Sequence, residues 1–208
     1  MKATFLPALL LTACAVACAR SEPPVHAPIV HAQPHGSAAP AGEPAAPNAP
    51  LDPAAEKQAL GTEWTKWFPS GSTLRPVTDA AFPLFAVCSL AGQTNGWVFR
   101  TDRVPPAVRG MHGEIGVLVG VGRDALVKGV HVLETHENPP WFNRLAKAGF
   151  YDRFLRQRAD GVDAKADTVT GATVSSTAVR KDVFQSSQTV LAVPAVKALL
   201  TPPPAAAP

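Results

Sequence analysis

Side chains that could do chemistry are concentrated in one short stretch, Asp167-Thr168-Val169-Thr170-Gly171-Ala172-Thr173-Val174-Ser175-Ser176. Gly171 permits a tight turn, and a helix is expected to begin just after it. The first backbone amides of a helix have no partner inside it, and the helix dipole adds positive charge there, so such an end suits a phosphate. A threonine held there, such as Thr173, could bind a phosphate or be esterified to one. The same residue types also suit a helix start that is simply capped by a hydroxyl.

A long helix is expected to hold this stretch in place. Apolar residues follow it at helical spacing, namely Ala178, Val179, Val183, Val190 and Leu191. Their stripe predicts a helix packed against a sheet, with its first turn fixed in position. Pro194 is expected to interrupt it.

The motif Asp-x-x-Thr-Gly-Ala-Thr-x-Ser-Ser resembles the flavinylation motif of the FMN-binding domain family. That family includes the FMN-carrying subunits of the Rnf complex and of the sodium-translocating NADH:quinone oxidoreductase, and the N-terminal domain of NosR-type proteins. In the family, the last threonine of the core is esterified to the FMN phosphate. The resemblance therefore implies covalent FMN on Thr173, attached by a separate metal-dependent flavin transferase. It also implies that Asp167, Thr170, Gly171 and Ala172 belong to the cofactor site.

A second resemblance lies in Glu137-Asn138-Pro139-Pro140, where family members usually read Glu-Thr-Pro-Gly after a strand. It implies that Glu137 and Asn138 also contact the cofactor. Asn in place of Thr and Pro in place of Gly are departures from the pattern. They suggest a loop closer to the NosR-like or stand-alone members.

The residues around this loop allow several interpretations. Trp141, Phe142 and Phe150 are expected mainly in the core, with stacking of one of them on a flavin ring as the alternative. A basic cluster follows, consisting of Arg144, Lys147, Arg153, Arg156 and Arg158. It is interpreted as a solvated face or, alternatively, as a docking surface for an acidic partner or a charge that favours reduced anionic flavin. No metal site is predicted from His131, Glu134, His136 and Glu137, because strand geometry separates them.

The rest of the folded region predicts an α+β domain over residues 53–200, and the resemblance implies flavin at the N-terminus of its C-terminal helix. A helix is expected over residues 53–68, followed by a Phe-Pro turn like the one that opens FMN-binding domains. Apolar patterns predict a small mixed or antiparallel sheet of about four strands, at residues 84–90, 97–101, 114–121 and 126–135, with a turn at Thr94-Asn95-Gly96. Two short helices are expected between Trp141 and Leu155. Cys88 is expected to be a buried free thiol.

The N-terminus reads as a lipoprotein-type signal peptide over residues 1–18. Its apolar run is too short to span a membrane. A lipid-modified cysteine is expected at Cys14 or Cys18, with an ordinary secretory signal as the alternative. Residues 19–52 are a proline- and alanine-rich tether, and residues 201–208 a similar tail. This organisation predicts an extracytoplasmic, membrane-anchored protein on the periplasmic side.

Composition narrows the function classes. The net charge is only +3, and no basic stripe is interleaved with aromatic residues, so no nucleic-acid binding is expected. No acid–base pair for a substrate of its own is evident, so an electron carrier is favoured over an enzyme. Together with these exclusions, the resemblance implies a redox protein with covalent FMN that exchanges electrons with membrane or periplasmic partners. A regulatory or sensory FMN domain and a flavin-free lipoprotein are the alternatives.

Overall fold

The computed structural model describes residues 52–161 and 168–201. Five antiparallel strands form one sheet in which each strand is hydrogen-bonded to the next along the chain. They are β1 Thr73–Pro76, β2 Phe85–Cys88, β3 Thr94–Arg100, β4 Ile115–Gly122 and β5 Val127–Thr135. The predicted α+β class is confirmed, with one strand more than expected. Strand β1 gave little signal because it is short, has one buried residue and ends in a proline, as an edge strand can.

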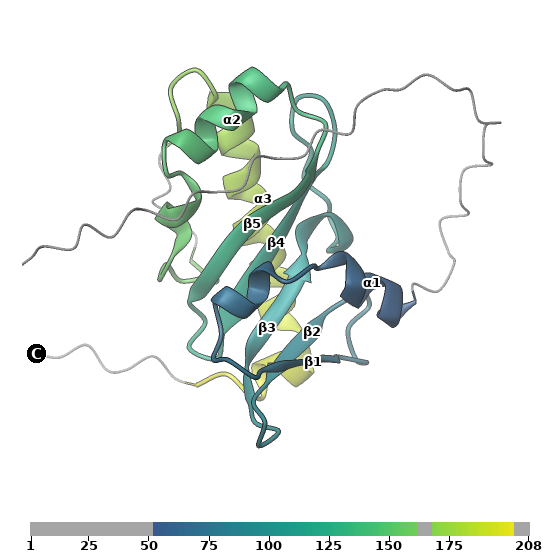
Figure 1. The fold of residues 1–208 in the computed structure, drawn as a ribbon. Coiled ribbons are helices and arrows are strands. Elements are labelled where there is room, and N and C mark those ends of the chain that lie inside the picture. The colour runs from purple at the N-terminus through teal and green to yellow at the C-terminus, as the bar shows by residue number, and fades with distance from the viewer. Residues whose placement is uncertain (1–51, 162–167, 202–208) are drawn as a thin grey trace, which may run out of the picture. The chain divides into compact units, whose positions relative to one another are not determined.

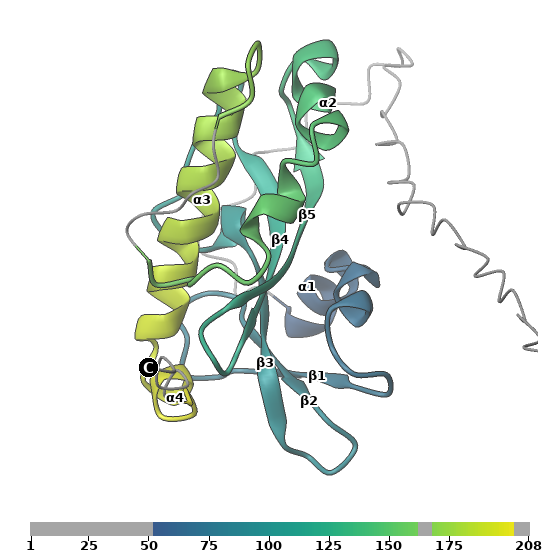
Figure 2. The same ribbon diagram turned by 90° about the vertical axis from the view of Figure 1, so that its left-hand side faces the viewer.

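Helices cover both faces of the sheet. They are α1 Pro53–Ala59, α2 Pro139–Lys147, α3 Thr173–Ala192 and α4 Pro194–Lys197, with short 3₁₀ helices η1 Glu63–Lys66, η2 Thr101–Arg103 and η3 Tyr151–Phe154. Helix α3 runs along one face and α1 lies on the other (Figures 1 and 2). None of the helices in the described part of the chain is long and apolar enough to cross a membrane.

Coverage on both faces explains why β4, an inner strand of the sheet, is buried along its whole length. Successive side chains of a strand point to opposite faces, so one set packs toward α3 and the other toward the α1 side. The core cluster on one side consists of Leu60, Trp64, Phe68, Leu74, Phe85, Val87, Val98 and Leu118. Helix α3 itself packs against β4, and this packing holds the start of the helix in position.

Two local predictions were wrong. The helix expected over residues 53–68 ends at Ala59, because the backbone at Gly61 turns with a φ of 62°, and η1 then begins separately at Glu63. The turn expected at Thr94–Gly96 lies earlier, where the Ser89 amide donates to the Gln93 carbonyl. Residues 94–96 belong to β3, and Leu90 lies exposed in the turn.

Other predictions were confirmed. Strands β4 and β5, the short helices α2 and η3, and the long helix α3 lie where the patterns place them. The five apolar residues expected on the inner face of α3 are buried, and Cys88 is a buried free cysteine. At the end of β5 the chain passes directly into α2, which lies at the same end of the sheet as the first turn of α3 (Figure 2). Segments far apart in sequence meet there.

Candidate functional site

A pocket of about 340 Å³ lies at this meeting point. Met111 and His112 come from the loop before β4, while Glu137, Asn138 and Trp141 come from the junction of β5 and α2. The remaining wall is formed by residues 171–175, at the start of α3. Its volume is within the range of small-molecule sites.

The turn before α3 is closed by its own hydrogen bonds. The Ala172 amide donates to the Val169 carbonyl at 2.9 Å. The Ser176 hydroxyl donates to the Thr173 carbonyl at 3.1 Å and accepts from the Val169 amide at 3.2 Å. Gly171 has a backbone φ of 78°, a value that residues with a Cβ rarely adopt. The sequence at this turn therefore fixes where the helix begins.

No side chain caps α3. Its N-cap residue is Ala172, and no side-chain capping hydrogen bond is present. The simple interpretation that a Ser or Thr hydroxyl caps this helix is therefore wrong. The amides of the first turn are directed toward the pocket end of the helix, where they can bind an anion.

The predicted site residues occupy different positions around this turn. Thr173 is the first residue of α3, is exposed and lines the pocket. Gly171 and Ala172 also line it, whereas Thr170 is an exposed turn residue that does not. Asp167, Cys14 and Cys18 lie outside the described residues.

Glu137 joins the three segments of the pocket. Only 6% of it is exposed. Its Oε2 accepts a hydrogen bond from the Ser175 hydroxyl at 2.6 Å, and its Oε1 accepts one from the His112 amide at 2.9 Å. Burial opposes ionisation, but the Ser175 hydroxyl and the His112 and Met111 amides outweigh it and lower the pKa of Glu137. The pocket therefore contains a carboxylate that is ionised at neutral pH.

Asn138 stands where the family pattern has Thr. It is the N-cap residue of α2, but its side chain makes no capping hydrogen bond. The side chain is exposed and lines the pocket. Its amide is thus placed to contact a ligand, and the helix does not use it.

The rim of the pocket is apolar and exposed. Trp141 is 47% exposed, Met111 70% and Val174 56%. Among the described residues six large hydrophobic side chains are exposed, and these three line one pocket. Clustered exposure of this kind marks a surface that binds something apolar. The expectation that the nearby aromatics are core is confirmed for Phe142 and Phe150, whereas Trp141 lies in the wall of the pocket.

Sequence reasoning missed part of this site. Met111, His112 and Val174 were not expected in it, and Ser175 was noted only for its hydroxyl. Ser175 could have been found, because it lies two residues after Thr173. Met111 and His112 gave no signal, since the contact of His112 with Glu137 spans 25 residues of sequence.

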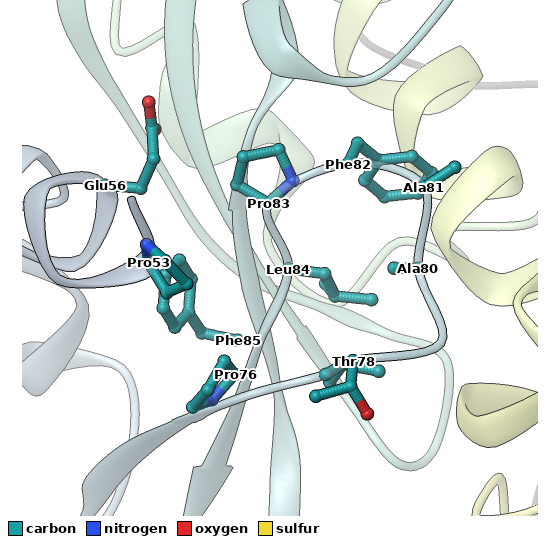
Figure 3. Close-up of a pocket in the computed structure, with 11 residues that line it drawn as sticks. Pro53, Glu56, Pro76, Thr78, Ala80, Ala81, Phe82, Pro83, Leu84 and Phe85 are labelled. Atoms are coloured by element: carbon teal, nitrogen blue, oxygen red, sulfur yellow. The ribbon is translucent and has the colours of Figure 1, made fainter. Parts of the chain in front are cut away.

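A larger pocket of about 410 Å³ lies elsewhere, between α1 and the β1–β2 connection (Figure 3). Its wall is formed mainly by proline, alanine, leucine and phenylalanine side chains. None of the residues predicted to bind a cofactor lines it. The smaller pocket at α3 is the one that combines an anion-binding helix end, a buried carboxylate and an apolar rim.

Comparison with known families decides the kind of site. Residues 110–186 match the model of the FMN-binding domain. The family that residues 110–186 resemble is the FMN-binding domain. The matched range begins just before Met111 and extends into α3, so the FMN-binding domain match includes every residue that lines the pocket. The resemblance noted in the sequence is confirmed, and FMN is the cofactor that it supports. No curated protein matches the chain.

The residues present fit FMN. The uncapped first turn of α3 suits its phosphate, and the exposed Trp141, Met111 and Val174 side chains suit its flat ring. The Asn138 side chain and the Ser175 hydroxyl add polar groups. The pocket thus combines polar and apolar groups, as FMN does.

Proposed function

We propose that this protein is an extracytoplasmic electron carrier that holds FMN through a phosphoester to the hydroxyl of Thr173. The observation that carries the proposal is the position of Thr173. It is an exposed hydroxyl at the uncapped start of α3, in a pocket with an apolar rim, within the FMN-binding domain match. Bound FMN would supply reversible uptake and release of electrons.

Attachment needs outside help. A threonine hydroxyl is a weak nucleophile at neutral pH, and the pocket shows no Ser-His-Asp or Cys-His arrangement to activate it. Direct condensation of Thr173 with free FMN would also release a water molecule, and this is unfavourable in aqueous solution. A donor with an activated phosphate avoids this, and FAD is the simplest, because its FMN phosphate is half of a pyrophosphate.

In this proposal a separate flavin transferase moves the FMN group from FAD to Thr173. The Thr173 oxygen forms a bond to the FMN phosphorus, the pyrophosphate P–O bond breaks, and AMP leaves. The hydroxyl proton passes to a base of the transferase and then to solvent. The chain's own part is to present the hydroxyl on a rigid helix end, with the first-turn amides of α3 as partners for the phosphate.

The other pocket residues orient and shield the ring in this proposal. Trp141 and Met111 cover apolar ring surface, while Asn138 is free to donate to or accept from a ring heteroatom. Glu137 holds the His112 loop and Ser175 together, which fixes the distance between the two walls. Half-exposed Trp141 leaves one side open for a redox partner.

Intact mass tests the proposal. The full chain is co-expressed with a flavin transferase and examined by intact mass spectrometry and in-gel flavin fluorescence. Wild type is expected to gain the mass of FMN minus water and to fluoresce, while Thr173→Ala gains neither. Thr177→Ala is the matched control, because Thr177 is an exposed threonine of α3 that lies outside the motif and does not line the pocket. Wild type without added mass beside a transferase that labels another substrate would refute the proposal.

A further inference from the structure

Arg144 lies against both the turn and the apolar wall of the pocket. Its Cζ atom is 4.2 Å from the centre of the Trp141 ring, so the guanidinium stacks on that ring. On the other side it touches the backbone at Gly171, where a Cβ would overlap the Arg144 Nη1 atom. The guanidinium is therefore held between two residues that line the pocket.

With a phosphodiester on Thr173, the pocket would hold more negative charge than the start of α3 can neutralise. Glu137 is ionised and buried in the pocket wall, with a lowered pKa. A phosphodiester on Thr173 would add a second negative charge to the same small space, and like charges repel. The helix dipole supplies only about half a positive charge. A full positive charge close to the turn would offset the remainder.

Arg144 is within reach of that phosphate. The Cα atoms of Gly171 and Thr173 are at most about 7.6 Å apart, because consecutive Cα atoms are 3.8 Å apart. The Arg144 side chain is exposed, so its end can shift without disturbing the core. A guanidinium also binds phosphate oxygens through two parallel N–H groups, which a single ammonium does not do. Among the described residues, Arg144 has no ion pair with a carboxylate that would compete.

We propose that Arg144 is the counter-ion of the Thr173 phosphodiester and positions the FMN phosphate at the start of α3. This inference rests on the proposed function, and it adds a residue outside the Asp-x-x-Thr-Gly-Ala-Thr motif to the site. The Trp141 ring holds the guanidinium in place by stacking on it. Trp141 would therefore contact the flavin ring and also position the cation that binds the phosphate. Lys147, one turn further along α2, is exposed and basic but touches neither Trp141 nor Gly171 in the contacts of the pocket.

The test compares Arg144→Gln, Arg144→Lys and the control Lys147→Gln in the full chain. The initial rate of FMN attachment by the transferase is measured by intact mass at low and high salt. Arg144→Gln is expected to slow attachment about tenfold and to weaken its salt dependence, with partial recovery in Arg144→Lys. Lys147→Gln, which removes the same charge, is expected to match wild type. Urea unfolding checks that all variants are folded.

A second measurement does not depend on rate. After prolonged attachment, the ³¹P resonance of the phosphodiester is recorded for each labelled protein. It is expected to move in Arg144→Gln and to stay in place in Lys147→Gln, because Arg144, unlike Lys147, contacts the phosphate. Wild-type rates and an unmoved resonance in Arg144→Gln would overturn the inference while leaving covalent attachment intact. Absence of label in wild type would overturn both.

Discussion

At the scale of single residues, Glu137 and Asp182 show opposite solutions for a buried carboxylate. Glu137 is stabilised as an anion by one hydroxyl and by backbone amides of the Met111–His112 loop. Asp182 on α3 is 2% exposed, and neither of its carboxylate oxygens has a hydrogen-bond partner among the described residues. Burial raises the pKa of Asp182 to about 7, because it outweighs the opposing effect of the nearby Thr101 and Ser186 hydroxyls and the Val108 backbone, and the charge of Asp102 adds to it. Glu137 therefore links the segments of the pocket, whereas Asp182 makes the stability of the fold depend on pH.

Glu137→Ala is expected to destabilise the protein by about 2–3 kcal/mol, because it leaves the Ser175 hydroxyl and the His112 amide without their acceptor. Since the folded-state pKa of Glu137 is lowered, its stabilising effect is present above the ordinary pKa of a glutamate and is lost as the pH falls through the folded-state value. Urea unfolding at pH 7 and at pH 3.5 measures both effects. Glu114→Ala is the control, since Glu114 is exposed and its nearest cation, Arg109, is 3.8 Å away. An equal loss in both variants would contradict this role for Glu137.

Asp182→Asn is expected to flatten the pH dependence of stability. The folded-state pKa of Asp182 lies above its unfolded value, so wild type loses stability as the pH rises from about 4 to about 7, where the buried group must ionise. At pH 8 the variant should be more stable than wild type, by on the order of 2–4 kcal/mol. Exposed Asp152→Asn should change little at either pH. A wild-type unfolding free energy that is constant between pH 5 and pH 8 would exclude the effect.

At the scale of elements, the first turn of α3 is held in position by the sheet and by α2. The body of the helix is buried against the sheet, whereas its first residue is exposed at the pocket. Gly171 sets the direction of entry through its positive φ and its contact with Arg144. The geometry of this turn is therefore coupled to α2, although the two elements are separated in sequence by more than 20 residues.

Gly171→Ala measures that coupling. The substitution is expected to destabilise the protein by about 1.5–2 kcal/mol. About 1 kcal/mol of this is strain at positive φ, and the rest is the contact with Trp141 that the flexible Arg144 guanidinium loses when it shifts away from the new Cβ. In an Arg144→Ala background the cost should fall to about 1 kcal/mol, a coupling that a double-mutant cycle in urea detects. Gly92 is a matched control, because it has the same φ of 78° but open space around it. Equal costs in the two backgrounds would mean that Arg144 does not press on this turn.

At the scale of the whole molecule, the proposal places the domain outside the cytoplasm on a lipid anchor and a proline-rich tether. Cys14 and Cys18 are the two candidate anchors. Cells supplied with a labelled fatty acid are expected to incorporate it into wild type, and either Cys14→Ser or Cys18→Ser abolishes the label while the other variant keeps it. Labelling retained in the double variant, or absent from wild type, would contradict a lipid anchor at these cysteines.

Much of the fold could be predicted from the sequence because its strongest patterns are local. The apolar strands β4 and β5 and the buried stripe of α3 have clear periods, so they were found. Strand β1 and the break at Gly61 were missed because short edge strands and single turn residues give weak signals. At the site, Thr173 stood out through its motif, whereas the Glu137–His112 contact and the exposure of Trp141 depend on tertiary packing that no local pattern encodes.

Peptide mapping is the most direct test of the proposed phosphoester between the Thr173 hydroxyl oxygen and FMN. Trypsin releases residues 166–180 of the flavin-loaded protein as one peptide that contains Thr168, Thr170, Thr173, Ser175, Ser176 and Thr177. Tandem mass spectrometry of this peptide is expected to place the mass of FMN minus water on Thr173 alone. Flavin found on another residue of the peptide, or a peptide that carries none although the intact protein is labelled, would contradict the account.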